Sequence, residues 1–228
     1  FSKPQPNDGV ERIVRINSMR EKFGIEDVSA ILSAKTPPPA LMMPKVRSPD
    51  EVKMLDQLLS EAGHDTRLHV IIETNVGLEA AYEIAHSSSR IDAMFFGAID
   101  MAPELRCDMA WEPLLYARSK VVHAAASAGL DVIDVPYMDL EDLDGMRLAA
   151  EQARMLGFSG KGSIHPKQIP ILNEVFTPSP DQITRARRTI AEFEKADTGL
   201  VVIYGKFIEK PVLWEMYRMV SIADRMGL

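Results

Sequence analysis

Six short apolar runs recur along the chain, and they constrain its fold more than any other sequence feature. Each run has the length and residue types of a buried strand, and helical patterns lie between consecutive runs. This alternation is typical of βα units and predicts a parallel sheet in an α/β protein. The predicted strands are IVRIN (13–17), ALMMPKV (40–46), LHVIIE (68–73), AMFFGAID (93–100), DVIDVP (131–136) and GKGSIHP (160–166).

Helix-start signals mark the segments between the runs. Ser48 can cap a helix that Pro49 opens, and Glu51 would complete a capping box. Gly129 is placed to end the helix that follows Glu112. A second capping box is predicted at SPDQ (179–182), where the inward positions are Ile183, Ala186, Ile190 and Phe193.

The pattern changes after residue 196. TGLVVIYGKFIEK (198–210) predicts two strands around Tyr204 and Gly205, followed by a helix that opens at Pro211. No long linker precedes this segment, so we expect residues 197–228 to form a small lid on a main portion of residues 1–196. The predicted inward positions of the last helix are Leu213, Met216, Val220 and Ala223.

Charge and cysteine content exclude several functional classes. The formal net charge of −7 in 228 residues leaves no basic stripe, so nucleic acid and anionic membranes are not expected partners. Cys107 is the single cysteine and cannot form an internal disulfide. No apolar run approaches the ~20 residues that span a bilayer. We therefore expect a cytoplasmic protein.

Two carboxylates end neighbouring predicted strands. Glu73 closes LHVIIE and Asp100 closes AMFFGAID. Active sites of parallel α/β folds collect at the carboxyl ends of strands, where two such groups repel each other unless a cation lies between them. Oxygen ligands favour Mg²⁺, whereas the alternative is that each carboxylate is a helix cap or the partner of a surface lysine. The sequence pattern alone leaves both interpretations open.

Other chemistry-bearing residues give weaker signals. Arg15, in the first predicted strand, is placed to hold an anionic substrate group or developing negative charge. His165 precedes a proline and is expected to be a structural hydrogen-bonding residue, and Cys107 has no nucleophile context. Glycines 157, 160 and 162 could cradle a phosphate, although Gly157 serves equally well as a helix stop.

Taken together, seven phrases resemble the family of the citrate lyase β subunit and the malyl-CoA and citramalyl-CoA lyases. They occur in family order over nearly the whole chain, and their joint occurrence makes the resemblance specific. The phrases are VRIN, MMPKV, IIETNVGLEAAYEIA, FFGAIDMA, YARSKVVHAAASAGLDVIDVPYMDLED, ARMLGFSGKGSIHPKQI and GKFIEKP.

The resemblance implies a (β/α)8 TIM barrel that uses Mg²⁺, with Mn²⁺ as a substitute. It makes Glu73 and Asp100 the metal ligands and Arg15 the cation that stabilises an enolate. The backbone of Gly97, Ala98 and Ile99 would face a keto-acid carboxylate. Glu209, where the family typically has Asp, would act in a neighbouring subunit's site, which implies an obligate homo-oligomer, expected to be a trimer.

A closed barrel of this type needs eight strands, and only six precede the lid. Six strands would leave unpaired edges, so we expect the sequence to be part of a longer protein that supplies two earlier strands.

The reaction implied by the resemblance is retro-Claisen cleavage of a CoA thioester. Citramalyl-CoA or malyl-CoA would give acetyl-CoA and an α-keto acid. Four alternatives remain at this stage: a thioesterase, an aldolase acting on free acids, a citrate lyase β-type subunit that needs an acyl-carrier protein, and a homologue that only binds.

Overall fold

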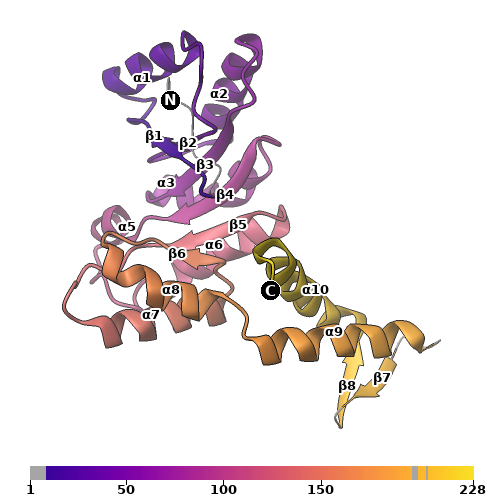
Figure 1. The fold of residues 1–228 in the computed structure, drawn as a ribbon. Coiled ribbons are helices and arrows are strands. Elements are labelled where there is room, and N and C mark those ends of the chain that lie inside the picture. The colour runs from indigo at the N-terminus through magenta and orange to yellow at the C-terminus, as the bar shows by residue number, and fades with distance from the viewer. Residues whose placement is uncertain (1–8, 197–199, 204) are drawn as a thin grey trace. The chain divides into compact units, whose positions relative to one another are not determined.

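The computed structural model describes residues 9–196, 200–203 and 205–228. The chain divides into two compact units, Phe1–Gln168 and Ile169–Leu228 (Figure 1). Two helices before residue 196 thus group with the C-terminal hairpin. The boundary predicted at residue 196 separates a barrel portion from a lid, which is a different division from these two compact units, and it stays a prediction.

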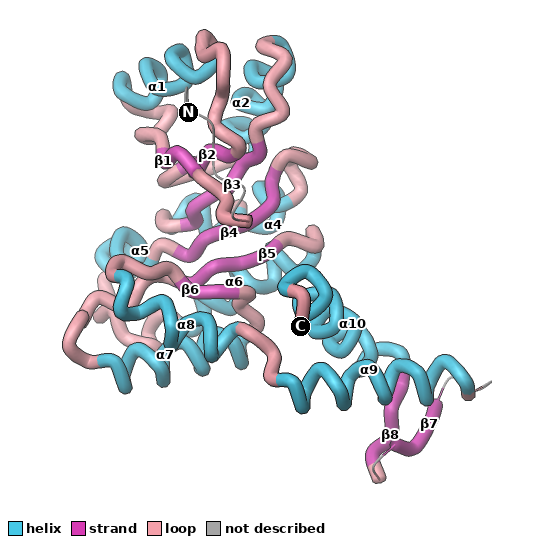
Figure 2. The backbone as a smooth tube through the Cα atoms, viewed as in Figure 1, coloured by secondary structure: helices cyan, strands magenta, loops and turns pink. Residues whose placement is uncertain are grey.

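The first unit is built on a six-stranded parallel sheet whose spatial order, β1 to β6, is also the order along the chain. Figure 2 shows these strands side by side with helices along them. A strand order that proceeds in one direction without reversal is typical of a (β/α)8 barrel, whereas the order reverses in a doubly wound sheet. The strands are β1 (Ile13–Arg15), β2 (Ala40–Met43), β3 (Arg67–Ile72), β4 (Ile91–Phe96), β5 (Asp131–Asp134) and β6 (Gly160–Lys161).

Helices connect each strand to the next, as the sequence predicted. Gly129 follows one of them with a φ of 71°, which confirms it as a helix stop. Gly157 ends another with a φ of 112°. The helices of this unit are α1 (Lys22–Leu32), α2 (Pro49–Glu61), α3 (Asn75–Glu79), α4 (Ala81–Ala85), α5 (Ala98–Leu105), α6 (Leu115–Ser127), α7 (Leu143–Leu156) and the 3-10 turn η1 (Pro166–Gln168).

Three local predictions were wrong. Ser48 precedes α2, but its side chain makes no capping hydrogen bond. Glu51 instead accepts hydrogen bonds from the Arg47 N–H and from the Arg20 guanidinium. Residues 98–100 begin α5 and do not continue β4. Strand β6 covers only Gly160–Lys161, because the following residues turn to meet the side chain of Gln168.

The two faces of the sheet have different roles. Side chains alternate along a strand, and paired residues on neighbouring strands share a face. The register pairs Ile72 with Phe96, and the Arg118 guanidinium of α6 lies 5.0 Å from the Phe96 ring. This face therefore lies under the helices, and we call it the helix face. It carries Val70, Ile72, Met94, Phe96, Val132 and Asp134, whereas the opposite, inner face carries Arg15, Met42, His69, Ile71, Phe95 and Ile133.

The second unit contains α8 (Ile169–Phe176), α9 (Pro180–Lys195), the antiparallel strands β7 (Leu200–Ile203) and β8 (Lys206–Glu209), and α10 (Lys210–Met226). The predicted capping box of α9 is formed by Ser179 and Gln182. Tyr204 lies outside the described residues. The core confirms the predicted inward faces and contains Ile190, Phe193, Ile203, Ile208 and Leu213, against which Val201, Met216 and Val220 pack.

Within the described ranges of both units, every helix is too short or too polar to cross a membrane.

Candidate metal centre

Glu73 lies directly after β3 and is buried, with 4% of its surface exposed. Its Oε1 atom accepts a hydrogen bond of 2.9 Å from the Lys45 N–H. Thr74, not Glu73, caps the following helix α3, because the Thr74 hydroxyl accepts from the Gly77 N–H at 3.0 Å. The helix-cap alternative therefore does not explain why a carboxylate ends this strand.

Lys45 connects the two predicted metal ligands. Its φ of 52° is unusual for a residue other than glycine and turns its backbone N–H toward Glu73. The Lys45 Nζ atom lies 3.4 Å from Oδ1 of Asp100, which stands in the first turn of α5. Asp100 therefore has the lysine partner that the alternative interpretation requires, but the backbone N–H of the same lysine also donates to Glu73.

The charges around Glu73 show why a cation would be favourable there. Burial raises the pKa of Glu73, and the charge of Asp100 raises it further. The Lys45 N–H and the positive charges of Arg15 and Lys45 lower the pKa in part. Asp100, Arg15 and Lys45 therefore all act on the charge of Glu73, and the roles of Glu73, Asp100 and Arg15 in metal and substrate binding stay predictions.

Gly97 keeps space beside the Glu73 carboxylate. A Cβ atom at this position would lie 2.6 Å from Glu73 Oε2 and 2.5 Å from Glu73 Cβ. Because Gly97 has no side chain, Glu73 can lie against this backbone while the Lys45 N–H holds its Oε1 atom. The carboxylates of Glu73 and Asp100 are oxygen groups of the kind that suits a hard cation, which also keeps water or substrate oxygens.

We expect Gly97→Ala to lower Mg²⁺ affinity and turnover by about 100-fold, because the added methyl would displace Glu73. Isothermal titration calorimetry and steady-state kinetics measure the two effects. Gly160→Ala is the matched control, because a Cβ atom there would approach the Ile133 side chain, at 3.1 Å, and not Glu73. Unchanged Mg²⁺ affinity in Gly97→Ala would show that Glu73 Oε2 is not a ligand.

The predicted substrate-binding backbone is partly engaged within the protein. The Gly97 N–H donates to the Ile72 carbonyl at 3.0 Å, so this amide is not available to a ligand. Ala98 and Ile99 are the first residues of α5, whose opening N–H groups have no partner within the helix. The N–H groups of Ala98 and Ile99 therefore remain candidates for binding a substrate carboxylate, and that of Gly97 does not.

The remaining sequence candidates lie elsewhere. Glu209 ends β8 in the second unit and is exposed, so its predicted role in a neighbouring subunit stays a prediction. His165 Nδ1 accepts from the Lys167 N–H at 3.2 Å, which is a local structural bond. Cys107 is half-buried in the turn after α5.

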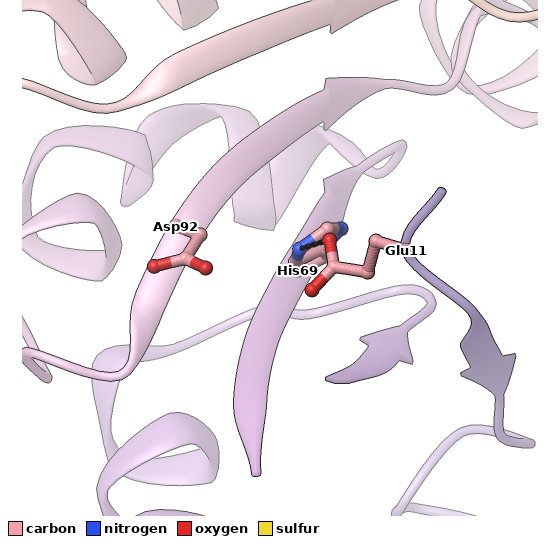
Figure 3. A group of neighbouring side chains, drawn as sticks. All are labelled: Glu11, His69 and Asp92. Atoms are coloured by element: carbon pink, nitrogen blue, oxygen red, sulfur yellow. Dashed lines mark ion pairs between the residues drawn. The ribbon is translucent and has the colours of Figure 1, made fainter. Parts of the chain in front are cut away.

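A second group of possible ligands lies at the opposite end of the sheet (Figure 3). Glu11 precedes β1, His69 lies in β3 and Asp92 in β4, with ligand atoms within 4.8 Å of one another. Arg67 pairs with both carboxylates, at 2.9 Å for Asp92, and so supplies the positive charge that a metal would bring. Burial lowers the pKa of His69. We assign this group to stability, as is typical of the amino ends of barrel strands.

Sequence reasoning missed Lys45. Its phrase, MMPKV, marked the end of a strand, but the positive φ and the bond to Glu73 depend on the neighbouring strand. The signal that could have found it is a lysine after a proline near the end of the predicted strand ALMMPKV (40–46), at the edge where Glu73 and Asp100 also lie.

Comparison with known proteins decides the family. The model of the HpcH/HpaI aldolase/citrate lyase family matches residues 3–166. The chain belongs to the HpcH/HpaI aldolase/citrate lyase family. It is therefore an enzyme of lyase type, with the barrel-type fold that its sheet order indicates.

Relatives of this family member include the mitochondrial citramalyl-CoA lyase of Rattus norvegicus. That protein is 31% identical over 232 residues, which cover 93% of this chain and 69% of the relative. The (3S)-malyl-CoA thioesterase of Cereibacter sphaeroides is 36% identical over 203 residues, covering 87% of this chain and 69% of the relative.

A solved family structure carries the metal. The CitE protein from Mycobacterium tuberculosis, in complex with magnesium, acetoacetate and coenzyme A, superposes with a TM-score of 0.74. It is 27% identical, and the match covers 93% of this chain and 78% of that chain.

Proposed function

We propose that this family member is a Mg²⁺-dependent lyase that cleaves the carbon–carbon bond of a 3-hydroxyacyl-CoA of the citramalyl-CoA or malyl-CoA type. The observation that carries the proposal is the buried Glu73 carboxylate, which interacts with Asp100, Arg15 and Lys45 at the carboxyl ends of the strands. Glu73 and Asp100 would hold Mg²⁺, or Mn²⁺ in its place. When bound, the metal supplies positive charge that favours loss of the substrate hydroxyl proton.

The other residues act on the substrate. As a base takes the hydroxyl proton, the alkoxide becomes the carbonyl of an α-keto acid and the adjacent carbon–carbon bond breaks. Its electron pair passes to the thioester as an acetyl-CoA enolate, which Arg15 stabilises. The amides of Ala98 and Ile99 bind the keto-acid carboxylate, and Lys45 keeps Glu73 and Asp100 in place.

Protonation of the enolate carbon completes the reaction. We assign this proton to Glu209 of a neighbouring subunit, because a carboxylic acid within reach of the enolate carbon can act as a general acid. This role requires a homo-oligomer, and a trimer remains our proposal. A cytoplasmic location also stays a prediction.

Thioester hydrolysis is the second candidate. The (3S)-malyl-CoA thioesterase is more similar in sequence, at 36% identity, than the citramalyl-CoA lyase, at 31%. A citrate lyase β-type function would act instead on a thioester held by an acyl-carrier protein.

Mass spectrometry of products separates these functions. With Mg²⁺, we expect the purified protein to convert citramalyl-CoA to equal amounts of acetyl-CoA and pyruvate, or malyl-CoA to equal amounts of acetyl-CoA and glyoxylate. The reaction should stop when the metal is chelated. Free CoA with the intact hydroxy acid would show a thioesterase. Absence of cleavage of soluble thioesters, with cleavage of a carrier-bound citryl thioester, would show the subunit-type function.

A further inference from the structure

A cavity of about 390 Å³ lies in the first unit, at the carboxyl ends of β5 and β6. Its walls come from the loop before α6, the loop after β5 and helix α7, and they include Met109, Trp111, Val135, Met138 and Leu148. Two cationic side chains, Arg118 and Lys161, also line it. The cavity is thus an apolar space with positive charge at one wall.

One buried carboxylate pairs with both cations. Asp134 and Lys161 are paired in the register of β5 and β6, and Lys161 Nζ donates to Asp134 Oδ2 at 2.5 Å. Arg118 Nε donates to Asp134 Oδ1 at 3.1 Å. The side-chain exposures are 7% for Arg118, 0% for Asp134 and 3% for Lys161. This cluster of three residues therefore carries a net charge of +1 away from water.

The cluster has unused hydrogen-bonding capacity. Among the described residues, Arg118 Nη1 is buried without a hydrogen-bond partner. The guanidinium lies 5.0 Å from the Phe96 ring centre and 4.8 Å from that of Trp111. These rings attract its positive charge but accept no hydrogen bond from Nη1. Burial lowers the pKa of Lys161, and repulsion from Arg118 acts in the same direction against the attraction of Asp134.

One further carboxylate lines the cavity but is directed to its own loop. Asp139 is exposed, and its Oδ1 accepts from the N–H groups of Glu141 and Asp142. It is therefore not a second buried partner for the cluster.

The cavity is separate from the candidate metal centre. Asp134 lies on the helix face of the sheet, together with Phe96. Glu73 lies toward the inner face, since a Cβ atom at Gly97 would touch both Glu73 and Ile71 of that face. The sheet thus stands between the two groups of charged residues.

We propose that this cavity is a second ligand site, which binds a small organic carboxylate through Arg118 and Lys161. A planar carboxylate matches the guanidinium fork and would satisfy Arg118 Nη1. It also neutralises the net charge of the cluster. The volume of about 390 Å³ lies within the ~300–1,000 Å³ typical of small-molecule sites, and apolar walls suit an alkyl chain better than a hydrated phosphate dianion.

Trp111 provides a direct readout. The chain has two tryptophans, so a Trp214→Phe variant reports Trp111 alone. This variant of the purified protein is titrated with sodium butyrate, and with sodium chloride or inorganic phosphate at matched ionic strength. We expect a saturable fluorescence change with butyrate, none with chloride, and at least tenfold weaker binding of phosphate. Tighter binding of phosphate would overturn the assignment to a carboxylate.

Two substitutions locate the binding. Ala149→Leu adds bulk to the cavity wall and leaves the three residues of the charged cluster unchanged, and Arg118→Lys keeps the charge but removes the fork. Each is expected to weaken butyrate at least tenfold, whereas Ala126→Leu, at an exposed position of α6, should not. Circular dichroism confirms that each variant is folded.

Either variant suffices if the other is unstable. An unsaturable signal, or one that both substitutions leave unchanged, would show that the cluster only joins β5, β6 and α6. No turnover is measured, so the result is independent of the proposed lyase activity.

Discussion

Glu73→Gln and Asp100→Asn are each expected to weaken Mg²⁺ binding by more than about 100-fold, and to reduce turnover by a factor on the order of 10³. Each substitution removes the negative charge of one of the two proposed ligands, so the remaining carboxylate would hold Mg²⁺ more weakly. The measurements are calorimetric titration with Mg²⁺ and kinetics at saturating Mg²⁺. Circular dichroism checks the fold of both variants.

Glu11→Gln is the matched control, because Glu11 belongs to the other group of carboxylates and histidine in the first unit. We expect Mg²⁺ binding in this variant to equal that of the unaltered protein within about twofold. If Glu11→Gln abolishes binding while Glu73→Gln and Asp100→Asn preserve it, the metal centre lies at the amino ends of the strands.

Arg15→Lys is expected to lower turnover by about 10²–10³-fold while leaving Mg²⁺ affinity nearly unchanged. Lysine keeps the positive charge that acts on Glu73, but it lacks the planar fork that can hold two oxygens of a developing enolate. Steady-state kinetics separates an effect on kcat from one on KM, and calorimetry measures the metal.

Arg20→Lys controls for the chemical change, because Arg20 follows the same strand but pairs with Glu51 instead of the candidate metal centre. Its turnover should stay within about twofold of that of the unaltered protein. Near-normal turnover of Arg15→Lys would remove Arg15 from the proposed mechanism.

Local sequence patterns determined the order of strands and helices and placed two carboxylates at neighbouring strand ends. Strand length, β-branched composition and glycine stops are properties of short segments, so they can be read without knowing their neighbours. The predicted inner faces of α9 and α10 were confirmed for the same reason. The observed strand β5 also ends on a carboxylate, Asp134, which the predicted run DVIDVP (131–136) did not place at a strand end.

Two kinds of prediction failed: a capping hydrogen bond that other groups replaced, and a strand end placed too far along the chain. The capping box of α2 was lost because Arg20 and the Arg47 N–H take the Glu51 carboxylate. The run AMFFGAID contains one breaker, Gly97, and the predicted strand extended across it, whereas β4 ends at Phe96 and α5 begins at Ala98.

Only the tertiary structure decided which charged groups meet. Lys45 reaches Glu73 through a backbone conformation that its own segment does not favour, and Gly97 matters because Glu73 lies against it. Arg118, Asp134 and Lys161 come from a helix and two strands, and the register of β5 and β6 brings them together. Side-chain contacts of this kind depend on register and helix packing, which arise from the simultaneous burial of many segments and are not contained in any one of them.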